Sequence, residues 1–183
     1  MSDNDVVLVI LSINLIATLV YFWIIANERR MQSFFGLPMV VQKSFVVLFV
    51  APLFVSPVVS QNKYDGHLIG NVVGGVVALI GLVMIVMAFF GTGVIPSIKE
   101  KSSLATTGVY GVVRHPIYAG TIVTFAGLNL LFEAVTPFLY LPLSICLYYV
   151  MTVYEEKGLV AEYGEEYSEY KKRVRKRIIP FVL

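Results

Sequence analysis

The sequence predicts an all-α integral membrane protein with five transmembrane helices, the last two paired as a hairpin, and a helical tail on the cytosolic side. Two observations support this prediction. Hydrophobic residues make up 57% of the chain and charged residues only 14%, whereas soluble domains carry about 25% charged residues. The apolar residues also gather into runs close to the roughly 20 residues that cross a bilayer. We expect one membrane domain over 1–183, with three spans in 1–90 and a loop, the hairpin and the tail in 91–183.

The N-terminal part contains three apolar runs. Residues 6–25 hold few polar side chains and end at a charged stretch. Residues 44–59 contain Pro52 and Pro57, which predict a kink. Neighbouring helices or waters can satisfy the backbone carbonyls that the prolines leave without a partner. Residues 69–90 form the third run, in which small residues would let another helix backbone approach closely. These small residues are Gly70, Gly74, Gly75 and Gly81.

The C-terminal part begins with a long polar connection over 91–115, and connections of this length without structure of their own are usually functional. A helix should begin at Pro116, because the residue before a proline avoids the helical region and proline favours the first helical position. Residues 116–132 and 137–153 then form two short spans. The tight turn 133–136 between them predicts an antiparallel hairpin.

The tail from Tyr154 onward is the most polar part of the chain. It is expected to be helical with interruptions at Gly158 and Gly164. Its tyrosines recur at helical spacing, so they could lie on the membrane surface or fold back over the hairpin. The basic run 171–177 is expected to anchor the tail to anionic lipid headgroups.

The distribution of lysine and arginine predicts the orientation in the membrane. The first and third connections and the tail are basic, whereas the N-terminus and the turn 133–136 carry no lysine or arginine. By the positive-inside rule the N-terminus lies outside and the C-terminus in the cytosol. A net charge of +2 is too small to indicate a nucleic-acid partner, so the expected partners are the bilayer and molecules dissolved in it. The acidic start is unlike the basic leader of a signal peptide, so the first span is expected to be retained.

A cluster of polar residues stands where the long connection meets the fourth span. Arg114 and His115 directly precede Pro116. The unpaired N–H groups and the positive dipole of a helix start favour an anionic ligand, and Arg114 would add donors. A hairpin that turns near residue 134 brings Glu155 and Glu156 back to the same membrane face. Ionisable groups this close to hydrocarbon are costly unless paired or hydrated, so these acids either mark a solvated helix end or belong to the site.

Such a site suits a ligand that carries both signs of charge. S-adenosylmethionine has a carboxylate, an ammonium group and a sulfonium, and cations sit well against aromatic faces and carboxylates. Residue types alone do not single it out. His67, His115 and Cys146 have no ligand-like spacing, so no bound metal is expected.

Four segments form a recognisable pattern: SLATTGVY at 103–110, RHPIYAG at 114–120, Glu155-Glu156, and YGEEYSEYKKRV at 163–174. In this order the pattern resembles the isoprenylcysteine carboxyl methyltransferase family and the related membrane phospholipid methyltransferases, over roughly the C-terminal half of the chain. The resemblance implies a small helical membrane enzyme that binds S-adenosylmethionine at the cytosolic face. Its acceptor would be lipophilic, such as a prenylated cysteine carboxylate or another lipid, thiol or amine.

Carried over position by position, the resemblance implies a cofactor pocket made by Ser102, Ser103, Leu104, Ala105, Tyr110, His115, Pro116, Ile117, Tyr118 and Glu155. Arg114 and Glu156 would lie beside it, and with Glu155 they are the candidate catalytic residues. Either acid could take the proton of an amine acceptor.

One departure from the family concerns the acceptor. The prenylcysteine enzymes place an acceptor-binding arginine four residues before the matched Glu155, where this chain has Met151. A carboxylate acceptor would therefore lack its partner unless Arg114 substitutes. The alternative to an enzyme is a non-catalytic membrane assembly or transport module that keeps the hairpin. Transport would predict ionisable residues within the spans, which hold almost none.

Overall fold

The computed structural model describes residues 3–92 and 104–178. Within these residues the regular elements are helices joined by loops, and one isolated bridge pairs Lys63 with Ala134. The elements in order are α1 Asp3–Ile25, α2 Glu28–Phe35, α3 Met39–Val59, α4 Leu68–Thr92, the short 3₁₀ helix η1 Gly108–Gly111, α5 Pro116–Leu131, α6 Val135–Tyr163 and α7 Glu165–Arg173.

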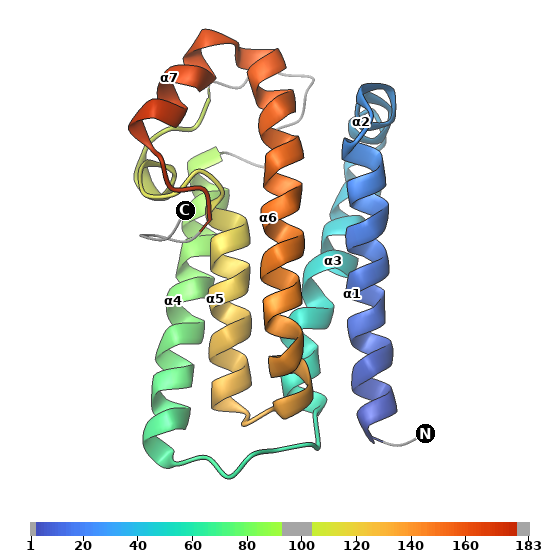
Figure 1. The fold of residues 1–183 in the computed structure, drawn as a ribbon, viewed down its shortest axis with the longest axis vertical. Helices are drawn as coiled ribbons and strands as arrows, with labels where there is room; N and C mark the ends of the chain where they lie inside the picture. Colours follow the sequence, from blue (N-terminus) through green and yellow to red (C-terminus); the bar gives the residue numbers. More distant parts are fainter. Residues whose placement is uncertain (1–2, 93–103, 179–183) are drawn as a thin grey trace.

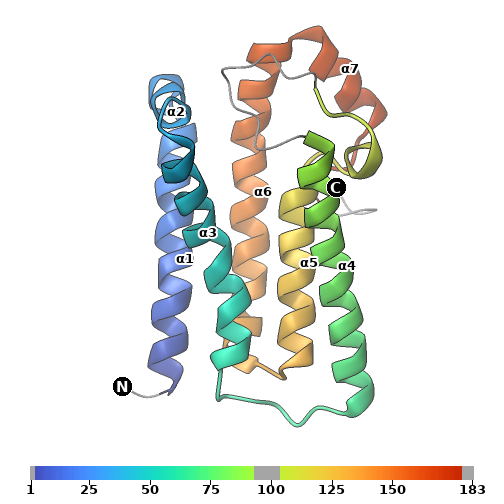
Figure 2. The same ribbon diagram turned by 180° about the vertical axis from the view of Figure 1, so that it is seen from behind.

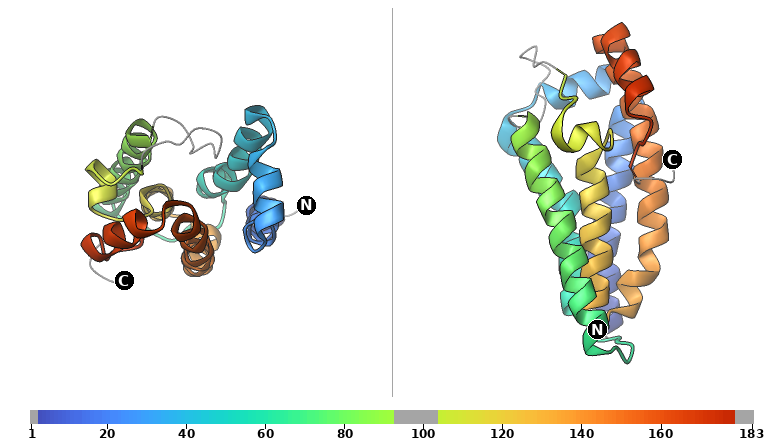
Figure 3. Two further views of the ribbon diagram at one scale, coloured as in Figure 1. Left: turned by 90° about the horizontal axis from the view of Figure 1, so that it is seen from above. Right: turned by 90° about the vertical axis from the view of Figure 1, so that its left-hand side faces the viewer.

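The long helices α1, α3, α4, α5 and α6 run side by side and alternate in direction (Figures 1 and 2). The N-terminus, the α3–α4 connection and the α5–α6 turn lie at one end, whereas α2, η1 and α7 lie at the other. Seen along the helices, α5 and α6 lie between α4 on one side and α1 and α3 on the other (Figure 3, left). This alternation places the start of α5 and the charged end of α6 together.

Three helical segments are long and apolar enough to cross a membrane: Asn4–Ile25, Leu68–Phe90 and Val135–Tyr163. The apolar stretches Ser44–Val59 and Pro116–Leu131 are shorter. Side chains such as Val72 and Leu79 of α4 are well exposed, which fits contact with lipid rather than water. The membrane character is therefore evident in three helices, and the count of five spans stays a prediction.

The α4–α5 pair packs through backbone-to-backbone contact. A Cβ added at Gly81 would lie 2.4 Å from the Thr124 nitrogen, and one added at Gly127 would lie 2.2 Å from the Ala78 nitrogen. Gly74 is equally tight, with the Leu131 nitrogen at 2.5 Å. Small residues at helix interfaces permit this approach in membranes.

The predicted role of small residues is thus confirmed at Gly74 and Gly81 but is wrong at two other positions. A Cβ at Gly70 would meet nothing within 4 Å, and one at Gly75 would make only an ordinary contact at 3.8 Å. Gly70 lies one turn before Gly74, whose Cβ would already meet Leu131, the last residue of α5, and Gly75 is turned about 100° around α4 from Gly74. The spacing of small residues therefore identified the helix but not its complete contact face.

Several predicted boundaries differ from the structure. α2 forms within the polar stretch that follows the first span, for which no helix was predicted, and Asn27 accepts a hydrogen bond from the Arg30 N–H as its N-cap. α3 runs through Pro52 and Pro57 without ending. α6 also continues through Gly158, so the predicted interruption there is wrong; one glycine costs a helix only about 1 kcal/mol. The predicted interruption at Gly164 is confirmed, because α6 ends there and α7 follows. Gly164 has a φ of +57°, a conformation that glycine adopts easily.

The turn between α5 and α6 is shorter than predicted, because α6 already begins at Val135. Glu133 has a φ of +57° in this turn, and its carbonyl accepts the Tyr64 N–H at 2.9 Å. The Lys63 ammonium donates to the Phe132 carbonyl at 2.6 Å. These bonds tie the α3–α4 connection to the turn and fix the end of the molecule opposite the charged cluster.

Candidate functional site

α5 begins at Pro116, as predicted from the sequence. His115 occupies the N-cap position, but its side chain does not cap the helix. The first N–H groups of a helix lack intrahelical partners and, with the helix dipole, favour an anionic acceptor. The His115 ring is instead directed at α6, where it lies between two carboxylates.

The hairpin brings His115 and the two consecutive acids of α6 together, as the predicted turn required. His115 Nδ1 lies 3.5 Å from Glu155 Oε2, and Nε2 lies 3.4 Å from Glu156 Oε1. Consecutive residues of a helix point about 100° apart, so Glu155 and Glu156 face different surroundings. Glu155 keeps 21% of its side chain exposed, whereas Glu156 keeps 3%.

Glu155 is surrounded by phenol groups. The Tyr118 hydroxyl donates to Glu155 Oε1 at 2.5 Å and the Tyr21 hydroxyl donates to the same oxygen at 2.9 Å. Among the residues that the structure describes, Glu155 has no ion pair with an arginine or a lysine. Its negative charge is therefore stabilised by hydrogen bonds, and a cationic ligand group remains a suitable partner.

Tyr21 belongs to α1, so the site includes a helix for which no contribution to it was predicted. A single tyrosine in an apolar run is a weak signal, because tyrosine is common near membrane interfaces. Its aromatic neighbours extend the site. Ring contacts connect α1, α2 and α3 to α5 and α6 through Tyr21, Phe34, Phe45, Phe49, Tyr118 and Tyr148.

Glu156 has the opposite environment, because cations surround it. Arg114 Nε lies 2.8 Å from Oε1, and Arg177 reaches both oxygens, with Nε 3.1 Å from Oε1 and Nη2 3.0 Å from Oε2. Lys171 is 3.5 Å from Oε2. A carboxylate this buried requires such compensation. Its charge is balanced within the protein.

The segment 174–178, which follows α7, runs along the residues that precede α5. The Arg114 N–H donates to the Lys176 carbonyl and the His115 N–H to the Arg177 carbonyl, each at 2.9 Å. Arg114 Nη1 also donates to the carbonyls of Val174 and Arg175, at 2.7 and 2.8 Å. The guanidinium that was expected to offer donors to an anion is therefore bound within the protein.

α7 folds back over the hairpin, which decides between the two predicted placements of its tyrosines (Figure 1). Tyr167 and Tyr170 are buried with Val174, against Leu104 and Leu159. The Tyr170 hydroxyl donates to the Tyr110 carbonyl at 2.8 Å, so α7 holds the predicted pocket residue Tyr110 in place. Burial raises the pKa of both hydroxyls, so both stay protonated.

The other predicted pocket residues are placed as follows. Leu104 and Ala105 are half-buried and precede η1, which contains Tyr110, while Pro116 is buried and Ile117 half-buried at the start of α5. Ser102 and Ser103 lie outside the described residues. Met151, which stands where an acceptor-binding arginine was expected, is 1% exposed and belongs to the hydrophobic core.

Comparison with known proteins connects this arrangement to a family. Residues 69–166, more than half of the chain, match the model of the phospholipid methyltransferase family. The match includes all but the first residue of α4 and the whole of α5 and α6, and with them His115, Glu155 and Glu156. It excludes Tyr21 and the segment 174–178.

Three curated proteins are similar to parts of the chain. The methanethiol S-methyltransferase 1 of Bradyrhizobium diazoefficiens is 44% identical over 73 residues, which is 36% of this chain and 22% of that protein. The nickel-cobalt-cadmium resistance protein NccN of Alcaligenes xylosoxydans is 28% identical over 97 residues, 53% of this chain and 46% of that protein. The cobalt-zinc-cadmium resistance protein CzcN of Cupriavidus metallidurans is 28% identical over 75 residues, 41% and 35% of the two chains. The chain thus spans less than half the length of each of these relatives.

Proposed function

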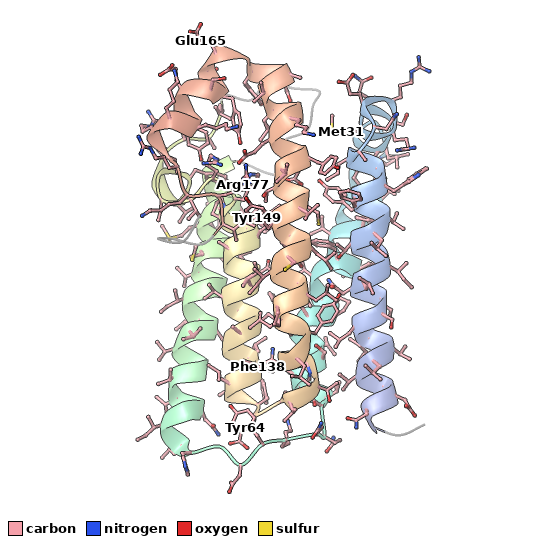
Figure 4. All side chains as sticks on the ribbon, viewed as in Figure 1. Met31, Tyr64, Phe138, Tyr149, Glu165 and Arg177 are labelled. Atoms are coloured by element: carbon pink, nitrogen blue, oxygen red, sulfur yellow. The ribbon has the colours of Figure 1, made fainter. Side chains whose placement is uncertain are left out.

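The chain belongs to the phospholipid methyltransferase family, and we propose that it transfers a methyl group from S-adenosylmethionine to a lipophilic acceptor in the membrane. Among the described residues, the lysines and arginines other than Lys63 gather at the end of the molecule that carries the site, as Figure 4 illustrates for Arg177. By the positive-inside rule this end faces the cytosol, where the donor would be available. The N-terminus would then lie on the opposite side.

The observation that carries the proposal is the surroundings of Glu155. This carboxylate stands next to His115 and the start of α5, accepts two tyrosine hydroxyls and has no arginine or lysine partner in the described part of the chain. A carboxylate and aromatic faces suit a sulfonium or ammonium, and the helix start suits a carboxylate. The residues present therefore fit both charges of S-adenosylmethionine.

In this proposal Glu155, His115, Tyr118 and Ile117 hold the donor, with Leu104, Ala105 and Tyr110 on the η1 side and Ser102 and Ser103 as further candidates. S-adenosylmethionine supplies an activated methyl group with its leaving group already attached. The protein has only to align acceptor and methyl group and to exclude water. Arg114 and Glu156, which bind each other, would act by positioning and not by touching the reacting atoms.

The acceptor is proposed to be uncharged or able to lose a proton. Met151 is buried in the core and Arg114 is bound to Glu156, so a carboxylate acceptor lacks a basic partner among these residues. The methanethiol S-methyltransferase relative makes thiols the first acceptors to test, followed by amines, whose proton Glu155 is placed to take. Of the acceptors considered, a prenylcysteine carboxylate is the least favoured.

A second candidate is a non-catalytic membrane module, since two of the relatives carry names of metal-resistance proteins. Such a module would keep the hairpin but would not need a carboxylate, such as that of Glu155, available to bind a cationic ligand. Isothermal titration of the detergent-purified protein with S-adenosylmethionine separates the two candidates. A labelled-methyl assay with thiols, amines and lipid extract then identifies the acceptor class.

The decisive variant is Glu155→Gln, which removes the charge and keeps an oxygen for the tyrosine hydroxyls. We expect a loss of donor affinity of at least about tenfold, because a charge-assisted contact contributes about 1.5–3 kcal/mol. The control is Glu162→Gln, an exposed position further along α6. Full affinity and turnover in Glu155→Gln would refute the proposed site.

A further inference from the structure

Arg177 lies outside the residues matched by the family model. It belongs to the basic run 171–177, which was predicted to bind anionic lipid headgroups. The structure turns its side chain inward instead. Nε and Nη2 contact the two oxygens of Glu156 at 3.1 and 3.0 Å, and the guanidinium lies 5.1 Å from the centroid of the Tyr149 ring (Figure 4). A bidentate contact with one carboxylate is a geometry that arginine offers and lysine does not. The bond to Glu156 also raises the pKa of Arg177.

The main chain of the same residue holds His115. The Arg177 carbonyl accepts the His115 N–H at 2.9 Å, while Ile178 is 3% exposed and packs in the hydrophobic core. One residue therefore fixes both the backbone of His115 and the carboxylate that faces its ring. Glu156 Oε1 lies 3.4 Å from His115 Nε2, which leaves Nδ1 facing Glu155 at 3.5 Å.

We propose that Arg177 is a positioning residue for the donor site: by fixing Glu156 and the His115 backbone it sets the orientation of the His115 ring against Glu155. The part of this proposal that concerns the donor rests on the proposed function, whereas the part that concerns the ring does not. Arg114 also binds the Glu156 carboxylate, but it belongs to the segment RHPIYAG at 114–120. Arg177 binds the same carboxylate from the C-terminal tail.

The experiment compares Arg177→Gln with Arg177→Lys and with Arg175→Gln as the matched control. The Arg175 side chain is exposed and carries the same charge, and its carbonyl is kept in the variant. The chain has two histidines, so protein with ¹⁵N-labelled imidazoles gives signals from His115 and from His67 alone. His67 precedes α4 at the opposite end of the molecule and is the internal reference.

In the ligand-free protein we expect Arg177→Gln to move the ring signals of His115 and to leave those of His67 in place. Titration with S-adenosylmethionine should show at least about tenfold weaker binding, the loss expected when one charge-assisted contact to the donor is weakened. Arg177→Lys should give smaller changes in both measurements, and Arg175→Gln should give none.

Unmoved His115 signals in folded Arg177→Gln would overturn the proposal, because a role limited to stability leaves the ring as it was. Moved signals with unchanged donor affinity would overturn the link to the donor site, and equal changes in Arg175→Gln would reduce the effect to general charge. If Arg177→Gln does not fold, the His115 signals of Arg177→Lys decide in the same way. Failure of the wild-type protein to bind S-adenosylmethionine would refute the proposed function, while the ring signals would still test the role of Arg177.

Discussion

The molecule has two regions that are held together in different ways. In the hairpin region, α4–α7 with residues 174–178, helices meet backbone to backbone at glycines and an ion-pair cluster surrounds Glu156. The N-terminal region, α1–α3, packs on the hairpin region through aromatic rings, such as Phe49 on Tyr148 at 5.1 Å. It adds isolated hydrogen bonds, such as Tyr140 to Asn14 at 2.8 Å.

This difference separates the two neighbouring acids of α6. Glu156 belongs to the interior of the hairpin region, where its charge is balanced, whereas Glu155 stands at the border with the N-terminal region and receives the Tyr21 hydroxyl from it. The hairpin region therefore supplies most of the contacts around the two acids, and the N-terminal region adds the Tyr21 hydroxyl.

The largest effect is expected from Glu156→Gln, which tests whether the ion-pair cluster supports the hairpin region. Removal of one partner from a buried ion pair costs about 3–5 kcal/mol, because the remaining charge is left uncompensated. Arg114, which is 8% exposed, would be that charge. Unfolding in a single detergent measures the loss, with Glu162→Gln as the control. A variant as stable as wild type would show that the cluster is not structural.

A medium effect is expected from Gly127→Ala, which tests the backbone contact between α4 and α5. The added methyl would lie 2.2 Å from the Ala78 nitrogen, so the helices must separate, at a cost of about 1–3 kcal/mol. Gly70→Ala is the matched control, because a Cβ there meets nothing within 4 Å. The same unfolding measurement applies, and equal effects of the two variants would contradict the packing described.

The smallest effect on stability is expected from Tyr21→Phe, which removes one hydrogen bond across the border of the two regions. Such a bond contributes about 0.5–1.5 kcal/mol, but its loss leaves the Glu155 oxygen with one fewer donor. Binding of S-adenosylmethionine should weaken severalfold, as measured by calorimetry. Tyr64→Phe, at the opposite end, is the control. Unchanged binding in Tyr21→Phe would place the N-terminal region outside the donor site.

Much of the hairpin region could be predicted from the sequence, because its signals are local. Pro116 fixes a helix start, and a short turn returns α6 antiparallel to α5, so His115 and Glu155 had to approach each other. Polar residues beside apolar runs then identified the cluster. The pairing of Glu156 was foreseeable in kind, since a buried acid requires cations.

The partners of these acids could not be predicted, because they depend on contacts between segments far apart in the chain. Nothing in the basic run 171–177 distinguishes Arg177, which points inward, from Arg175, which is exposed. Tyr21 reaches Glu155 only because α1 packs on α6, and neither helix has a pattern that specifies this neighbour. Gly158 was misread for a related reason, since packing along α6 outweighs the weak helix preference of one glycine.

The short turn between α5 and α6 means that the lengths of the two helices decide which residues meet at the other end of the hairpin. Hydrogen bonds from Tyr64 and Lys63 hold the turn in place, and His115 and Glu155 meet at the far end of the two helices. Each residue of helix advances 1.5 Å and turns 100°. Insertion of one residue in either arm would therefore bring a different side chain opposite the other arm, so the lengths of these two helices are constrained more tightly than the identity of most of their residues.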